Sequence, residues 1–233
     1  MELKNDNMPK ALKDCTIENS VVIFRYRSPF HRIHIQECVA EAFKADGVEL
    51  QEFRAINENE NSPSNEVRRL SYFSNGTLKF LVDRQAISFN CVSNYPGWET
   101  YFKFIKFAVS AIPNENLLFT EVGIRYISTY DLAIFDKLDG KVELNWYKDI
   151  EGAEIRFPAK GAGFKGLVRV TNLLRSVDGT KSKSFVDVDL TTSVPNGTLD
   201  NAFTQCEFIH HEEKKHYFQL LSSEFVNQLG PSY

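Results

Sequence analysis

The sequence predicts an α+β fold, in which a mainly antiparallel sheet of about eight or nine strands carries three or four helices packed on one face. One observation behind this is that stretches of alternating apolar residues follow one another directly, separated only by short turns. Another is that residues 33–45, 98–112 and 199–229 have the apolar periodicity of helices with one buried face. Strands and helices therefore do not alternate as in a parallel α/β fold.

The chain is predicted to form one domain preceded by a flexible arm. Residues 1–17 are polar and aperiodic, which is typical of a loose terminus. The segment 18–230 is long enough to bury one sizeable core. Within it, 18–130 and 131–230 each contain strands that lead into a helix, which suggests two related halves. The polar segment 57–66 is expected to be a loop in the first half.

Hairpin-connected strands dominate the first half. A β-branched and aromatic run at 20–27 predicts the first strand, which the helix at 33–45 follows. Another strand is expected at 48–56. Three more form a meander between residues 67 and 91. Its first turn is an Asn-Gly pair at 75–76, because both residues tolerate the positive φ angles of a type I′ turn.

A helix and a long strand form the centre of the predicted fold. Trp98 begins an apolar stripe that continues to Ile112, and Pro113 ends the helix. We expect Trp98 to anchor this helix in the core, against the strands. The strand that follows alternates between two faces. One face carries Val122, Ile124 and Tyr126, and the other carries Glu121, Gly123, Arg125 and Ile127.

The second half repeats this order less clearly. Three strands are expected between residues 153 and 191, and a helical region at 199–229 follows them. The apolar stripe of that region drifts around the helix axis, so we expect a bend or two helices. His210 and Glu213, or His211 alone, are expected to make polar contacts where the helix meets the sheet.

Two motifs at the centre of the chain resemble a known family. The Tyr-x-x-Trp-Glu motif at 95–99 starts the helix, and Gly-Ile-Arg-Tyr-Ile at 123–127 lies in the strand. Together they are similar to a sporadically distributed family of uncharacterised prokaryotic proteins, which has a Tyr-x-x-Trp helix start and a Gly-Leu-Arg-Tyr-Ile-Asn-like strand. Ser128 stands where that family carries Asn, and the Glu-Val pair at 121–122 stands where it carries Arg-Ile.

A second part of the resemblance is the Asp-x-Asp strand at 187–189, which precedes a C-terminal helix with His211 and Phe218. The resemblance spans most of the chain, from the first strand to the last helix. It implies a prokaryotic source, and the sporadic distribution of the family implies a mobile or defence-associated gene cassette. The family has no established activity, so the resemblance implies no catalytic residue.

Composition narrows the classes of partner. The net charge is −4, from 27 basic and 31 acidic residues without a long basic cluster, which argues against nucleic-acid binding. No stretch resembles a signal peptide or the ~18 apolar residues of a membrane span. The four cysteines form no C-x-x-C pair, which is typical of free thiols in a reducing compartment. We therefore expect a cytoplasmic protein that does not bind membranes.

Two motif-like segments are not interpreted as sites. Gly-Ala-Gly-Phe-Lys-Gly at 161–166 matches the G-x-G-x-x-G pattern, but a strand-like sequence follows it where a dinucleotide fingerprint needs a helix. A loop between strands is expected there. His-His-Glu-Glu-Lys-Lys-His at 210–216 lacks the H-E-x-x-H spacing of a zinc site. No catalytic residue, cofactor or metal site is therefore predicted.

The candidate ligand-binding residues are Arg125, Tyr126, Arg169, Asp187 and Asp189. The two aspartates share one face of a strand because they are two residues apart, and both arginines lie on other strands that can face them. Two interpretations remain open. The charges form an ion-pair network, or the carboxylates hold a metal ion or perform acid–base chemistry.

Two functions are expected from these features. The first is a non-enzymatic module that binds a protein or small-molecule partner. The alternative is a small-ligand sensor or enzyme with an aromatic-lined pocket, anchored by Arg125 or by Asp187 and Asp189. A pocket of more than about 300 Å³ that contains Arg125 or Asp187 would favour the alternative. Phe107 lies opposite the core stripe of its helix, which predicts that the C-terminal helices or a second copy, in a homodimer, cover it.

Overall fold

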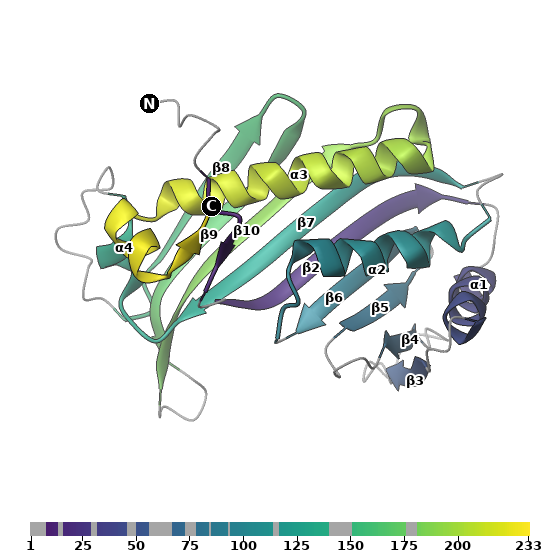
Figure 1. The fold of residues 1–233 in the computed structure, drawn as a ribbon, viewed down its shortest axis with the longest axis horizontal. Helices are drawn as coiled ribbons and strands as arrows, with labels where there is room; N and C mark the ends of the chain where they lie inside the picture. Colours follow the sequence, from purple (N-terminus) through teal and green to yellow (C-terminus); the bar gives the residue numbers. More distant parts are fainter. Residues whose placement is uncertain are drawn as a thin grey trace, which may run out of the picture.

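The protein is described by a computed structural model (Figure 1). The predicted loop at 57–66, the Asn-Gly turn at 75–76 and Cys15 lie outside the described residues. The described residues are 8–13, 16–28, 32–45, 50–55, 67–72, 78–83, 85–92, 94–113, 117–139, 151–175 and 181–233.

In this part of the chain, nine antiparallel strands form one sheet in the order β3-β4-β5-β6-β2-β7-β10-β9-β8. The predicted antiparallel α+β fold is therefore confirmed. The short strands β1 and β11 pair with each other and join the two ends of the chain. The strands are β1 Ala11–Leu12, β2 Ile17–Arg27, β3 Leu50–Ala55, β4 Val67–Tyr72, β5 Leu78–Val82, β6 Ala86–Val92, β7 Leu118–Tyr130, β8 Glu154–Gly161, β9 Phe164–Arg175, β10 Ser182–Ser193 and β11 Pro231–Ser232.

The α-helices lie on one face of the sheet, where α2 and α3 run across its central strands (Figure 1). The predicted break in the C-terminal helical region falls at Leu221, between α3 and α4. Among the described residues, no helix is long and apolar enough to cross a membrane. The α-helices are α1 Arg32–Ala45, α2 Trp98–Ser110, α3 Leu199–Leu220 and α4 Ser223–Gln228, and short 3₁₀ turns lie at Ile134–Lys137 and Pro195–Gly197.

The two parts of the sheet have the same strand order. In the first part β2 lies at the centre, β3 to β6 return from the outer edge to pair with β2, and α2 follows. In the second part β7 lies beside β2, β8 to β10 return from the other edge to pair with β7, and α3 follows. The second half of the topology thus begins with β7, whereas the division at Tyr130 put this strand at the end of the first half.

The core lies between the sheet and the helices. On β7, Val122, Ile124 and Tyr126 are buried on the helix side, as their alternation predicted. Phe24 of β2 occupies the middle of this layer and is fully buried. Its ring contacts rings of three other elements edge to face, which is a favourable aromatic geometry. These rings belong to Phe89 of β6, Phe119 of β7 and Phe203 of α3.

Trp98 lies between α2 and α3, which corrects the expectation that it packs between α2 and the strands. Its ring stacks on that of His210, with the ring centroids 3.9 Å apart, and its Nε1 donates a hydrogen bond of 2.8 Å to Glu207. The physical reason is position: Trp98 is the first residue of α2, and α3 crosses the same face of the sheet beside it. Tyr101 and Ile105, further along α2, are the residues that face the sheet core.

The outer side of α2 is covered in part by α1. The Phe43 ring of α1 lies 5.2 Å from that of Phe104 and 4.9 Å from that of Phe107, measured between ring centroids. Phe107 is therefore covered by α1 and not by the C-terminal helices. It remains 38% exposed, and a second copy of the chain over this side stays a prediction.

The G-x-G-x-x-G segment forms a hairpin turn, as expected. Gly161 ends β8, Phe164 begins β9, and the two residues pair across the turn. Gly163 in the turn has a φ of 90°, a conformation that glycine adopts without steric cost. No helix follows the segment, so it lacks the geometry of a phosphate-binding loop.

Candidate functional site

The predicted charged residues meet on the sheet face opposite the helices. Arg125 of β7 donates two hydrogen bonds of 2.8 Å to the two carboxylate oxygens of Asp187 on β10. Arg169 of β9 donates a third, of 3.2 Å, to Asp187 Oδ2. The Asp187 side chain is only 9% exposed, and this bidentate geometry is a strong form of ion pair. The contacts agree with the ion-pair interpretation of these three residues.

Asp189 lies beside this network without joining it. It pairs with Arg125 in the strand register but makes no hydrogen bond or ion pair with the described part of the chain. Burial raises the pKa of its carboxyl group, and the nearby Arg125 partly opposes this. A hollow of about 230 Å³ beside Asp189 contains Arg125 and Thr191. It is smaller than the 300 Å³ expected of a ligand pocket, and charged side chains line much of it.

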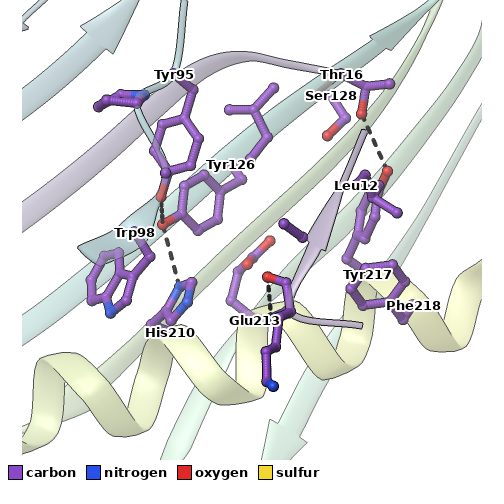
Figure 2. A pocket seen from close by; sticks show the side chains of 16 residues that line it. Leu12, Thr16, Tyr95, Trp98, Tyr126, Ser128, His210, Glu213, Tyr217 and Phe218 are labelled. Carbon is purple, nitrogen blue, oxygen red and sulfur yellow. Dashed lines mark hydrogen bonds between the residues drawn. The ribbon is translucent and has the colours of Figure 1, made fainter. Parts of the chain in front are cut away.

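A larger cavity, of about 300 Å³, lies on the other face of the sheet. Its floor is β7, which contributes Tyr126 and Ser128, and its sides are the start of α2 and the middle of α3 (Figure 2). Strand β1 and the segment after it close one end, with Leu12 and Thr16. Of the five predicted site residues, only Tyr126 lines this cavity. Strand alternation turns the other four to the opposite face.

A chain of hydrogen bonds crosses one end of the cavity. The Tyr95 and Tyr126 hydroxyl groups are 2.9 Å apart, and the Tyr126 hydroxyl lies 3.3 Å from Nδ1 of His210 (Figure 2). Burial, followed by the neighbouring charges of Lys214 and His211, lowers the pKa of His210 to about 3. The imidazole is therefore neutral at physiological pH. Its ring stacks on Trp98, so it forms a rigid wall of the cavity.

A second group of hydroxyls holds the opposite end. Thr16 Oγ1 lies 3.3 Å from the Tyr217 hydroxyl and 3.4 Å from that of Tyr130. The two tyrosine hydroxyls also hydrogen-bond to each other. Burial raises the pKa of both phenols, so they keep their protons. These contacts tie the N-terminal segment to β7 and α3 across the cavity.

Glu213 brings an unpaired carboxyl group into the space between these two ends. Its residue is 4% exposed, and its carboxyl group makes no hydrogen bond or ion pair with the described part of the chain. Figure 2 shows the side chain reaching from α3 into the space between Tyr126 and Tyr217. Burial raises the pKa of Glu213 well above its usual value of 4.5, and Lys214 only partly opposes this.

The arrangement is suited to binding more than to catalysis. His210 is a poor base because its conjugate acid is so strongly disfavoured, and its Nδ1 is engaged with Tyr126. Cys206 is buried in α3 and its thiol pKa is raised well above the usual range, so it is not an activated nucleophile. No group of three His, Cys, Asp or Glu side chains in the described segments is placed to hold a metal ion.

The sequence predicted polar contacts for His210 and Glu213 where the helix meets the sheet, and it did not predict a cavity. His210 contacts Tyr126, whereas Glu213 makes no hydrogen bond or ion pair with the described residues. A signal was present in their spacing. His210, Glu213 and Tyr217 recur at intervals of three and four residues, so they share one face of α3. That face continues the stripe of Cys206 and Ile209, which are fully buried. Polar residues in a buried stripe mark a place where the core is interrupted.

Comparisons with models of protein families and with curated proteins gave no match. The geometry itself distinguishes the two candidate sites. On the open face, Asp187 is already paired with Arg125 and Arg169. In the helix-side cavity, Glu213 is buried beside aromatic rings and has no partner among the described residues.

Proposed function

We propose that this protein is a non-enzymatic binding module whose small organic ligand occupies the cavity between β7, α2 and α3. The observation that carries the proposal is the buried Glu213 carboxyl group, which faces open space of about 300 Å³ without a partner. A buried polar group without a hydrogen bond lowers the stability of the fold by about 1–3 kcal/mol. A ligand that pairs with the group can offset this loss.

The walls of the cavity support a small-molecule ligand over a protein segment. Tyr95, Trp98, Tyr126, Tyr217 and Phe218 line it, together with few polar groups, as in typical ligand pockets. The hydrogen bonds at both ends hold four of its hydroxyl-bearing side chains in place. A preorganised site of this kind loses little conformational entropy when a ligand enters.

The test is the recovery of small molecules that co-purify with the protein, measured by native mass spectrometry and by analysis of a denaturing extract. Ser128→Leu fills the cavity from its floor, since Ser128 is 2% exposed and lines it. Thr191→Leu, on β10, is the matched control because it fills the hollow on the opposite face. We expect the bound molecule to be lost from Ser128→Leu and retained by Thr191→Leu.

Other outcomes argue against the proposal. Loss of the molecule from Thr191→Leu alone would move the site to the open face beside Arg125 and Asp189. Retention by both variants would exclude both cavities. If nothing co-purifies and a thermal-shift screen of small molecules also fails to stabilise the wild type, ligand binding itself is contradicted. Far-UV circular dichroism must first show that each variant is folded.

A prokaryotic, cytoplasmic setting is part of the same proposal. Three thiols, those of Cys38, Cys91 and Cys206, are free, which suits a reducing compartment. The resemblance of the Tyr-x-x-Trp helix start and the Asp-x-Asp strand to a sporadically distributed prokaryotic family supports the source and a mobile or defence-associated role.

A further inference from the structure

Glu213 makes no hydrogen bond with the described donors that line the cavity. The Tyr126 hydroxyl is engaged with Tyr95 and His210, and the Tyr217 hydroxyl is engaged at the opposite end. Lys214, the neighbouring cation, directs its Nζ to the backbone carbonyl of Lys10 at 2.9 Å and makes no ion pair with Glu213. The group that completes this site must therefore come from outside the described chain.

The surroundings of Glu213 favour a positively charged group. A buried carboxyl group ionises readily when a cation lies next to it, and the pair replaces an unpaired group by a charge-assisted contact. The rings of Tyr126 and Tyr217 line the same cavity, whereas both faces of the Trp98 ring are occupied by His210 and Phe102. The faces of aromatic rings attract cations and repel anions. Both features favour a positively charged ligand. Lys10 and Lys214 also line the cavity and oppose this, but the Lys214 ammonium group is engaged with the Lys10 carbonyl.

The cation is organic and not a metal ion. Among the described residues, Glu213 is the one carboxyl group that lines this cavity, and a divalent ion needs several oxygen or nitrogen ligands. The described residues include no group of three suitable ligands. Aromatic walls instead fit an alkylated ammonium group, whose weak hydration lets it leave water for a π-rich site.

We propose that the ligand is a small organic cation whose ammonium group pairs with the Glu213 carboxylate and lies against the aromatic walls of the cavity. This rests on the proposed function, because it assigns a chemical class to the ligand of the same cavity. In the free protein, burial shifts Glu213 toward its protonated form. When the cation binds, the O–H bond of the carboxyl group breaks, the proton passes to solvent, and the carboxylate pairs with the ammonium group.

Other titratable groups also face Glu213, and they could in principle contribute to proton release on binding. From α3 these are Lys214, His210 and Tyr217; β7 contributes Tyr126, and the segment at β1 contributes Lys10. The two phenols keep their protons and the imidazole is already neutral, for the reasons given above. A Glu213→Gln variant removes the proposed proton and leaves the lysines unchanged.

The experiment compares two probes of the same shape, choline and its uncharged isostere 3,3-dimethylbutan-1-ol. Binding is measured by isothermal titration calorimetry at pH 7.5 in two buffers of different ionisation enthalpy. We expect the wild type to bind choline about tenfold or more tightly than the alcohol. Choline binding should release a proton and therefore give different heats in the two buffers. Because choline does not titrate, the proton must come from the protein.

Glu213→Gln keeps the shape and hydrogen-bonding capacity of the protonated acid. In this variant we expect the preference for choline to disappear, together with the buffer dependence of the heat. Glu212→Gln is the matched control: it makes the same change one residue earlier on α3, where Glu212 pairs with Lys215 away from the cavity. It should bind choline like the wild type. Melting temperatures equal to that of the wild type near pH 4.5 would show that both variants fold.

Three results would overturn the cation assignment. Equal binding of the two probes to the wild type would contradict it and leave the cavity as a site for neutral ligands. Retained choline preference in Glu213→Gln would place the cation elsewhere. If neither probe binds, the assignment fails, and the co-purification experiment with Ser128→Leu decides separately whether the cavity binds anything.

Discussion

At the scale of single residues, an acid and a base that burial keeps in their neutral forms lie three positions apart on α3. Glu213 keeps its proton because burial disfavours the carboxylate, and His210 lacks one because burial disfavours the imidazolium. Each therefore holds a protonation state that differs from that of the unfolded chain over part of the pH range. Their effects on stability have opposite signs, and their pH windows overlap only between the usual pKa values of 4.5 and 6.5.

The Glu213 effect appears above its usual pKa. Below about pH 4.5 the folded and unfolded states both hold the proton. As pH rises further, the unfolded chain ionises while the folded protein does not, so the folded state binds more protons and loses up to about 1.4 kcal/mol of stability per pH unit. Glu213→Gln removes this loss. Its melting temperature should match that of the wild type near pH 4.5 and exceed it increasingly as pH rises above that value.

His210 acts on the acid side. Between the usual pKa of 6.5 and the folded-state pKa of about 3, the imidazole is protonated in the unfolded chain but neutral in the folded protein. The free energy of unfolding therefore falls as pH falls. His210→Gln should therefore weaken the fall of the melting temperature toward acid pH. The effect of Glu213 on the melting temperature above pH 7 should remain. Thermal melts of wild type and both variants from pH 4 to 8 measure both. Parallel curves for all three proteins would contradict the burial of these groups.

Sequence reasoning at this scale succeeded where strand alternation decides the outcome. Alternation alone put Arg125 and Asp187 on one face of neighbouring strands, and the structure joins them by two hydrogen bonds. It failed for Glu213. Helical spacing shows that Glu213 faces the sheet, but whether that face meets a packed side chain or a cavity depends on how far α2 and α3 stand apart, which no local pattern encodes.

At the scale of elements, α2 and α3 are joined by an aromatic stack. Trp98 lies between Phe102 of its own helix, 4.8 Å away between centroids, and His210 of α3. The sequence predicted both helices and the central strand β7 with bounds close to those observed, because each has strong periodicity. The predicted partner of Trp98 was wrong. The position of Trp98 in the apolar stripe indicates that its side chain is covered, but it does not indicate which element covers it.

The stack gives a prediction for α2. Trp98→Ala should destabilise the protein by about 2–4 kcal/mol, near the lower end of the range for large aromatic truncations, because Trp98 is only partly buried. Trp98→Phe keeps a ring over His210 and should cost less than about 1.5 kcal/mol. Urea unfolding followed by far-UV circular dichroism measures both. A Trp98→Ala protein within about 0.5 kcal/mol of wild type would show that the stack does not hold the two helices together.

At the scale of the whole molecule, the two halves of the topology share one sheet and one core. Strands β2 and β7 pair along nearly their whole length at the centre of the sheet. Phe24 of the first half packs against Phe119 and Phe203 of the second. Neither half would bury its central strand without the other. The pattern of strands and helices predicted two related halves, but it contained no information on how they join.

A shared core predicts that the protein unfolds in one cooperative transition. Circular dichroism and calorimetry should give coincident curves, with calorimetric and van't Hoff enthalpies equal. Ile87→Val in the first half and Ile209→Val in the second each truncate a nearly fully buried side chain. Each should cost about 0.5–1.5 kcal/mol and lower the same transition by a few degrees. The segments 17–113 and 117–233, expressed separately, should not fold, because each would expose the apolar seam between β2 and β7. Two transitions, each lowered by only one of the variants, would show instead that the halves are independent domains.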